Sequence, residues 1–269
     1  MPADAIPAGA GASLPAPPLP RLSGIALFLD VDGTLVAFAP RPHDVRVEAG
    51  LPALLQRLRV ALGGALAPIS GRPLQEIDQL LQLPRGAAAG LHGAQLRRAD
   101  GVVVAASRES PRMRVLRRRA GELVAGLPGV LVEDKPDALA LHYRNAPAAA
   151  AAVSRAADTL AREAGADYTL QPGNHVIELK PAGTDKGSAV ATLMGEAPFE
   201  GRTPWVLGDD LTDEHAFAVA HDLGGNGIIV GPRRPTAARH ALADPAAAHA
   251  WLAALAAQEP ALPRRSATR

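Results

Sequence analysis

Two aspartates, Asp30 and Asp32, follow directly on an apolar run in the stretch IALFLDVDGTL, residues 25–35. In an extended chain, residues two apart point to the same side, so the two carboxylates begin on one face. Carboxylates that close together do not both ionise easily unless a cation or a shared proton lies between them. Because hard divalent ions prefer oxygen ligands, Mg²⁺ with several retained waters is the natural occupant. The other interpretation is an ordinary acidic turn.

A second acidic cluster has the same placement. Asp209, Asp210 and Asp213 come just after the apolar residues 203–208. Taken alone, such a cluster is typical of a turn or a helix cap. Two clusters at the ends of two strands favour a shared metal site instead, because open parallel sheets bind their ligands at the carboxyl ends of their strands.

Two predicted helix starts carry groups that suit an anion. Ser70 and Arg72 stand at one of them and Lys186 at the other. Backbone N–H groups at a helix N-terminus, helped by a hydroxyl or an ammonium, bind phosphate. Ser70 on its own is more typical of a simple N-cap. Together with the aspartates, these groups describe phosphoryl transfer, with a carboxylate nucleophile, a metal, and Asp32 to move a proton.

The composition sets bounds on the class of protein. The chain has 269 residues, a formal net charge of +1 and no cysteine. The small net charge argues against a dedicated nucleic-acid surface, and the lack of cysteine excludes disulfides, thiolate metal sites and cysteine nucleophiles. No window offers the roughly 18 apolar, uncharged residues of a membrane-spanning helix, so such a helix is not expected. The proline-rich N-terminus lacks a basic leader, so we expect a cytoplasmic protein with no secretory signal.

The catalytic residues must be positioned by strands that alternate with helices. This alternation predicts an α/β fold with a doubly wound, Rossmann-like parallel sheet. Strands are expected over 25–31, 64–70, 86–96, 101–107, 203–210 and 227–231, and helices over 50–62, 73–83, 186–196, 213–223, 235–242 and 245–257.

The middle of the chain follows a different pattern. Helical spacing over 112–127 and 147–165 alternates with predicted strand pairs over 130–144 and 168–181, the second turning at 172–174. An α+β cap inserted into the core accounts for this order. The expected division is a disordered arm (1–21), a catalytic core (22–107 and 181–258), an inserted cap (108–180) and a flexible tail (259–269).

At this point the motifs DVDGT, SGR, KG and GDDLTDE resemble the four motifs of the haloacid dehalogenase-like phosphohydrolases, in order and at plausible separations. The insert is similar to the α/β cap of the sugar-phosphatase branch. Within that branch, the stretches GLHGAQLR, VEDKPDALALHYR and GNHVIELKPAGTDKG look like the trehalose-6-phosphate phosphatases. The resemblance covers almost the whole chain, from about Leu22 to Ala257.

This resemblance implies hydrolysis of trehalose 6-phosphate to trehalose and phosphate with Mg²⁺, through an aspartyl-phosphate, as the last step of trehalose biosynthesis. It makes Asp30 the nucleophile and a metal ligand. It makes Asp32 the general acid/base, with its backbone carbonyl on the metal. Ser70 and Lys186 would hold the phosphoryl group. The remaining metal residues would be Asp209, with Asp210 and Asp213 in or next to the shell.

In the cap, the resemblance implies that Glu133, Lys135 and Glu178 bind sugar hydroxyls. Arg72 either contacts the phosphate or pairs with a carboxylate. His92 and His142 could line the sugar site, although a hydrogen-bonded structural role is favoured for both. The expected partner is a small sugar phosphate, and the protein is expected to be a monomer that binds neither nucleic acid nor membranes.

Other functions remain open at this stage. The first is a phosphatase of another sugar phosphate, such as sucrose 6-phosphate or mannosyl phosphoglycerate, since only the cap residues argue against it. The second is a phospho-accepting signalling domain, which also uses acidic residues, a hydroxyl and a lysine around Mg²⁺. A catalytically silent sugar-binding module is the third, and the intact acidic set disfavours it.

Overall fold

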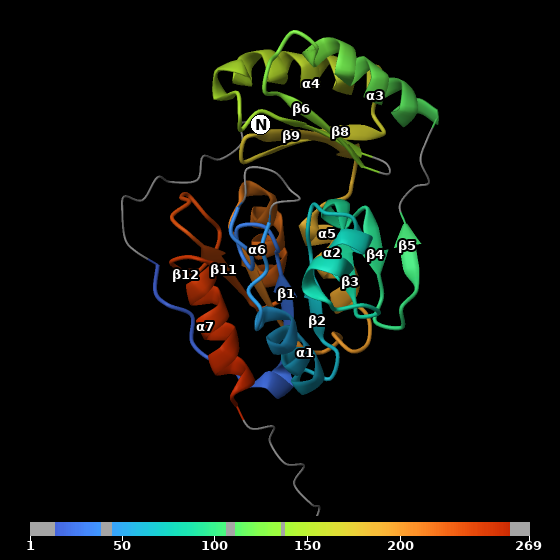
Figure 1. Ribbon diagram of the computed structural model, residues 1–269. Helices are drawn as coiled ribbons and strands as arrows, with labels where there is room; N and C mark the ends of the chain where they lie inside the picture. Colours follow the sequence, from blue (N-terminus) through green and yellow to red (C-terminus); the bar gives the residue numbers. More distant parts are fainter. Residues whose placement is uncertain (1–13, 39–44, 106–110, 136–137, 259–269) are drawn as a thin grey trace, which may run out of the picture.

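The structure, a computed structural model, describes residues 14–38, 45–105, 111–135 and 138–258. Its core is a five-stranded sheet in the order β12-β11-β10-β1-β2, and every pairing in it is parallel. The strands are β1 (Ile25–Leu29), β2 (Leu66–Pro68), β10 (Thr203–Gly208), β11 (Asn226–Val230) and β12 (His240–Leu242). The first strand of the chain therefore lies inside the sheet, next to β10 (Figure 1).

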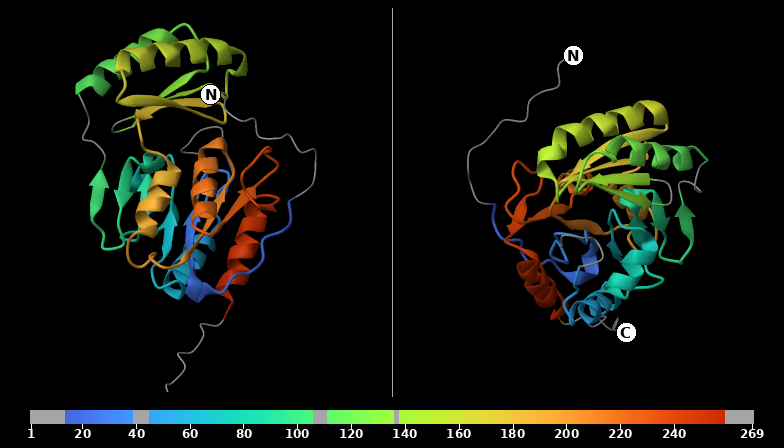
Figure 2. Two further views of the ribbon diagram at one scale, coloured as in Figure 1. Left: turned by 180° about the vertical axis from the view of Figure 1, so that it is seen from behind. Right: turned by 45° about the horizontal axis from the view of Figure 1, so that its top comes forward.

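Helices cover both faces of this sheet. On one face α1 (Leu51–Ala61) packs against α7 (Pro245–Ala256), and on the other α5 (Lys186–Met194) packs against α6 (Glu214–Asp222) (Figure 2). Helix α2 (Leu74–Leu81) follows β2 and contacts α1. The expected doubly wound α/β core is confirmed.

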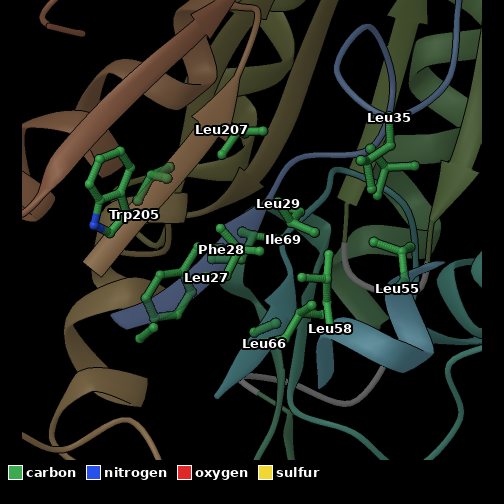
Figure 3. Close-up of a cluster of buried hydrophobic side chains, with 14 of the residues drawn as sticks. Leu27, Phe28, Leu29, Leu35, Leu55, Leu58, Leu66, Ile69, Trp205 and Leu207 are labelled. Carbon is green, nitrogen blue, oxygen red and sulfur yellow. The ribbon is translucent and has the colours of Figure 1, made fainter. Parts of the chain in front are cut away.

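The hydrophobic centre of the core is built around β1 (Figure 3). All five residues of this strand are buried, as expected for a parallel strand covered on both faces. Phe28 stacks on Phe199 with ring centroids 5.4 Å apart, and Trp205 stacks on Trp251 at 5.9 Å. A rigid, apolar β1 thus fixes the position of the polar residues that come after it.

Residues 86–105, the described part of the expected strands 86–96 and 101–107, differ from the prediction of further parallel strands. They form β3 (Ala88–Gly90), β4 (Gln95–Arg97) and β5 (Val103–Ala105), an antiparallel sheet of their own. A single isolated parallel bridge, Ile69 to Ala89, links it to the end of β2. The connections are too short for the crossover helices that parallel strands need, which is why these strands pair antiparallel.

The cap is a four-stranded antiparallel sheet in the order β6-β7-β9-β8. Its helices α3 and α4 lie on the face of the sheet that is turned away from the core (Figure 1). Their apolar sides and the sheet bury a second hydrophobic cluster, separate from that of the core. The elements are α3 (Pro111–Val124), β6 (Leu131–Lys135), β7 (Ala138–His142), α4 (Ala150–Ala164), β8 (Tyr168–Gly173) and β9 (Val176–Pro181).

Two sequence predictions of local structure need correction. Residues 235–242 were expected to be helical, but His240–Leu242 form β12, which pairs with β11. Backbone pairing at the sheet edge here overrides a weak helical propensity. The cap hairpin turns at 174–175 rather than 172–174, and Pro172 lies within β8. An edge strand such as β8 tolerates proline, because one side of it needs no N–H donor.

Residues 14–21 were expected to belong to a disordered arm, but they pack along the core. Pro15 O accepts a hydrogen bond from the Ala241 backbone N–H at 3.0 Å, and Pro18 O accepts from Trp251 Nε1 at 3.2 Å. Prolines lack N–H groups yet keep their carbonyls, so an extended proline-rich segment can serve as an acceptor for β12 and α7. The rest of the expected arm, 1–13, and the expected tail, 259–269, lie outside the described residues.

Within the described residues, the remaining regular elements are short 3₁₀ turns, and two of them adjoin the site described below. These turns are η1 (Leu22–Gly24), η3 (Leu91–Gly93), η4 (Pro147–Ala149) and η5 (Leu211–Asp213). None of the described helices combines the length and apolar character that crossing a bilayer requires.

Candidate functional site

The parallel pairing of β1 with β10 brings the two acidic clusters together. Leu29 pairs with Leu207 in the sheet, and the Asp30 backbone N–H donates to Leu207 O at 2.9 Å. Carboxylate oxygens of Asp30, Asp209 and Asp213 all lie within 4.8 Å of one another. Residues almost 180 positions apart in sequence therefore form one acidic site at the carboxyl edge of the sheet.

Gly33 allows the loop after β1 to reach this site. Its backbone adopts a φ of +91°, and a Cβ built on it would lie 2.3 Å from Asp209 Oδ2. Any residue with a side chain would displace Asp209 and would also be strained in this backbone region. Next to it, the Thr34 hydroxyl donates to Asp209 Oδ1 at 3.2 Å. The DVDGT turn therefore fixes the aspartate that follows β10.

Lys186 reaches the same cluster from the start of α5. The helix begins there because Asp185 caps it, in a reciprocal capping box with Ser188. Lys186 Nζ donates to Asp30 Oδ1 and to Asp213 Oδ1, at 2.6 Å each. Burial alone would lower the pKa of this ammonium, but the two carboxylates outweigh it and raise the pKa. Lys186 is therefore a charged, fixed donor beside Asp30.

The crowding of carboxylates has a clear electrostatic cost. Burial, partly offset by Lys186, and the nearby Asp213 raise the pKa of Asp30 to about 6. Burial and the neighbouring Asp30 and Asp213 raise the pKa of Asp209 to about 10. A divalent cation would favour the ionised forms of both, and a donor set of carboxylate oxygens fits a hard ion. The residues present therefore suit a metal of the Mg²⁺ type.

Asp213 and Asp210 are oriented differently from the other metal candidates. Asp213 Oδ2 accepts hydrogen bonds from the backbone N–H groups of Asp209 and Asp210, both at 3.0 Å. Asp213 therefore holds this loop with one oxygen and Lys186 with the other. Asp210 accepts from the backbone N–H of Leu211 at 2.6 Å and from that of Asn174, in the cap, at 3.1 Å. Asp210 does not belong to the group of three whose oxygens lie together.

Asp32 lies at the same edge and forms a salt bridge. Arg72 Nε and Nη2 donate to its two oxygens at 2.7 and 2.6 Å, and Arg72 Nη1 donates to Glu76 at 3.3 Å. Of the two roles left open for Arg72, contact with the phosphate or pairing with a carboxylate, the structure shows the pairing with a carboxylate. Ser70, buried at the end of β2, accepts the Arg72 backbone N–H at 3.1 Å.

The three predicted sugar-binding residues all come from the cap sheet and face the core. Lys135 Nζ donates to Glu178 Oε2 and to Gly71 O of the core, at 3.0 Å each. Glu133 and His142 form a hydrogen bond at 2.6 Å. Burial would raise the pKa of Glu178, but Lys135 and His92 lower it well below the usual range. Glu178 is therefore a buried, charged acceptor.

One cavity of about 560 Å³ joins the two sets of residues. It is within the usual size of small-molecule sites. All eleven predicted site residues except Asp213 line it, as do His92 and His142. The wall also includes residues that sequence reasoning missed: Phe38, whose ring lies 4.9 Å from Arg144 Cζ, and Asn174. Asn174 lies in the stretch GNHVIELKPAGTDKG that carries the resemblance, but its place in the cavity wall, like that of Phe38, depends on contacts between cap and core that local sequence does not specify.

Comparison with known proteins assigns the family. Residues 28–246 match the trehalose-phosphatase family. A probable trehalose-phosphate phosphatase of Sinorhizobium fredii is 42% identical over 239 residues, 88% of each chain. The trehalose-6-phosphate phosphatase of Escherichia coli is 42% identical over 213 residues, 79% of this chain and 80% of that protein.

Solved structures agree on the fold. The C-terminal domain of C. albicans trehalose-6-phosphate phosphatase matches with a TM-score of 0.79 at 22% identity, over 92% of this chain and 99% of that one. The resemblance inferred from the motifs and the expectation of a phosphatase are both confirmed. The chain belongs to the trehalose-phosphatase family.

Proposed function

We propose that this protein is a Mg²⁺-dependent phosphatase that hydrolyses trehalose 6-phosphate to trehalose and inorganic phosphate, the last step of trehalose biosynthesis. One observation carries the proposal. A single cavity is lined on the core side by Asp30, Asp32 and Lys186 and on the cap side by Glu133 and Glu178. Phosphoryl chemistry and hydroxyl recognition are therefore available to one bound molecule, which a phosphorylated disaccharide would require.

Asp30 is the nucleophile in this proposal. One of its carboxylate oxygens attacks the phosphorus, the bond from phosphorus to the sugar oxygen breaks, and an aspartyl-phosphate forms. Lys186, held 2.6 Å from Asp30 Oδ1, orients the carboxylate and offsets negative charge next to the transferred group. Ser70 and the backbone N–H groups after β2 supply further donors for the phosphoryl oxygens.

Asp32 moves the protons. In the first half-reaction it donates a proton to the departing sugar oxygen, and in the second it takes one from the water that attacks the acyl phosphate. The phosphoryl group then leaves as phosphate and Asp30 is regenerated. Two of the three guanidinium nitrogens of Arg72, Nε and Nη2, donate to the two oxygens of Asp32 and fix the direction of this carboxylate, so Asp32 takes up the proton that it donates only when this pair opens. Contact between Arg72 and the phosphate requires that this pair open.

The proposed metal ligands are the carboxylates of Asp30 and Asp209 and the backbone carbonyl of Asp32. Their neighbours Asp213 and Asp210 hold the loop that follows β10. When bound, Mg²⁺ supplies positive charge that stabilises the phosphoryl oxygens and keeps the crowded carboxylates ionised.

The cap supplies selectivity. Carboxylates of Glu133 and Glu178 can accept hydrogen bonds from sugar hydroxyls, and the Lys135 ammonium can donate to their oxygens. Closure of the cap over the core also excludes water from the acyl phosphate until the sugar leaves. The proposed domain limits remain those expected from the sequence: residues 22–107 and 181–258 form the core, and residues 108–180 form the cap.

The direct test is phosphate release from trehalose 6-phosphate, glucose 6-phosphate, sucrose 6-phosphate and mannosyl phosphoglycerate, each with Mg²⁺ and with a chelator. We expect turnover of trehalose 6-phosphate to dominate and to vanish with the chelator. Asp30→Asn protein, prepared in the same way, controls for contaminating phosphatases. Preference for another of these substrates would move the assignment within the phosphatase class. The monomeric state and cytoplasmic location stay predictions.

A further inference from the structure

His92 is a core residue whose side chain contacts the cap. It lies in η3, between β3 and β4, with φ 52° and ψ 36°, and Leu91 before it has φ 50°. Two successive residues other than glycine in the left-handed region cost free energy that the surrounding structure must offset. This unusual backbone directs the imidazole across the boundary between core and cap, where His92 Nε2 lies 3.0 Å from Glu178 Oε2.

Four residues close a ring of contacts across this boundary. His92 bonds to Glu178, Glu178 to Lys135, and Lys135 to the carbonyl of Gly71. The ring closes because the imidazole packs on Gly71, where a built Cβ would lie 2.6 Å from His92 Nε2. Two members come from the core and two from the cap, and Gly71 directly follows Ser70. The cap carboxylate of Glu178 is thereby held next to the loop that follows Ser70, by Lys135 through a hydrogen bond to Gly71 O and by His92 through packing.

The hydrogen-bond roles in this ring are fixed by chemistry. Glu178 is ionised and can only accept, so His92 must donate through Nε2–H. In the neutral ring Nδ1 is then an acceptor. Within the described residues, Nδ1 and Glu178 Oε1 are both buried without a hydrogen-bond partner. A carboxylate held at one oxygen by both His92 and Lys135 therefore keeps its second oxygen for a hydroxyl donor.

We infer that His92 is a positioning residue for substrate recognition: a core side chain that holds the cap carboxylate of Glu178 in the orientation that accepts a sugar hydroxyl. The inference rests on the proposed function. It predicts that selectivity for the sugar is encoded partly in the core, whereas the chemistry on the phosphoryl group does not depend on His92.

The matched pair of variants is His92→Asn and His92→Gln. Asparagine tolerates the left-handed backbone, but its short amide does not reach Glu178. The longer glutamine amide can restore an N–H donor near the Nε2 position. Steady-state kinetics would be measured on trehalose 6-phosphate and on p-nitrophenyl phosphate, which offers no sugar to the cap. Turnover of the aryl phosphate also reports that each variant is folded.

We expect His92→Asn to raise KM for trehalose 6-phosphate by about tenfold, because the variant loses one hydrogen bond to a charged group. The variant should leave kcat/KM for the aryl phosphate unchanged. His92→Gln should recover most of the difference. In a Glu178→Ala background, His92→Asn should have no further effect on KM, because the group it positions is gone.

Equal losses on both substrates, or the same rise in KM with and without Glu178, would overturn the inference and leave His92 with a structural role only. An unchanged KM in His92→Asn would overturn it as well. Failure of the proposed function looks different, because the wild-type protein would then show no preference for trehalose 6-phosphate over glucose 6-phosphate.

Discussion

Replacing Lys135 by methionine tests the division between recognition and chemistry most severely. Lys135 is 7% exposed, and its ammonium makes two hydrogen bonds of 3.0 Å, to Glu178 in the cap and to Gly71 O in the core. Burial would lower its pKa, but Glu178 and Glu133 raise it, so Lys135 is charged in the folded protein. Methionine fills much of the same space without the charge.

The expected size of the effect follows from these contacts. A hydrogen bond to a charged group contributes about 1.5–3 kcal/mol, so loss of the bond from Lys135 to the sugar should raise KM roughly ten- to a hundredfold. Glu178 also loses one of its two donors. Because His92 remains, we expect a destabilisation of about 2 kcal/mol, which lowers the thermal midpoint by roughly 4–8 °C.

The assay compares KM for trehalose 6-phosphate with kcat/KM for p-nitrophenyl phosphate, alongside thermal unfolding. Arg119→Met is the matched control, because it removes a charge from the same cap at a residue that pairs with Glu122 and Glu163 outside the cavity. The control should leave both substrates unaffected. If Lys135→Met slows the aryl phosphate as much as the disaccharide phosphate, the cap residue takes part in the chemistry and the reasoning is refuted.

The acidic residues of the cavity carry the other expectations. Asp30→Asn should abolish phosphate release, since an amide is neither a nucleophile nor an anionic ligand, and retained turnover in clean protein would remove Asp30 from that role. Asp209→Asn should raise the Mg²⁺ concentration for half-maximal activity by more than roughly tenfold, and Asp210→Asn should raise it less; the reverse order in a Mg²⁺ titration would reassign the ligand. Glu178 has a lowered pKa in the folded state, so the stability it adds is complete above its unfolded pKa of about 4.3 and is lost as the pH falls below that value. The difference in thermal midpoint between wild type and Glu178→Gln should therefore shrink from about pH 7 to about pH 3, and growth of that difference on acidification would contradict the assignment.

The core and the acidic site were accessible from the sequence because short-range patterns determine them. An apolar strand that ends in an aspartate specifies both burial and the position of the carboxylate, as in β1 and Asp30. Parallel pairing then brings Asp209 to the same edge without further information. The cap was predictable for the same reason, since its strands alternate and its helices have one apolar side.

The rest depends on contacts between distant segments. The strand β12 and the packed segment 14–21 acquire their structure from the sheet edge and α7, which local propensity does not encode. Asp210 has the side chain and the sequence position expected of a metal ligand. Its oxygens instead accept hydrogen bonds from backbone N–H groups, one of them from Asn174 in the cap. His92 was favoured as a structural histidine because nothing in its neighbourhood in sequence indicates Glu178.

The most direct test of the account is to trap a phosphoryl group on Asp30. Asp32→Asn protein would be mixed with p-nitrophenyl phosphate and Mg²⁺, since nitrophenolate leaves without a proton whereas hydrolysis of the acyl phosphate needs Asp32 as a base. We predict a burst of about one nitrophenolate per protein, followed by slow turnover. After acid quenching and borohydride reduction, the modification should map to the peptide that contains Asp30. The central role of this carboxylate would be contradicted if the wild-type protein turned over trehalose 6-phosphate while the Asp32→Asn variant gave no burst or carried the modification on another peptide.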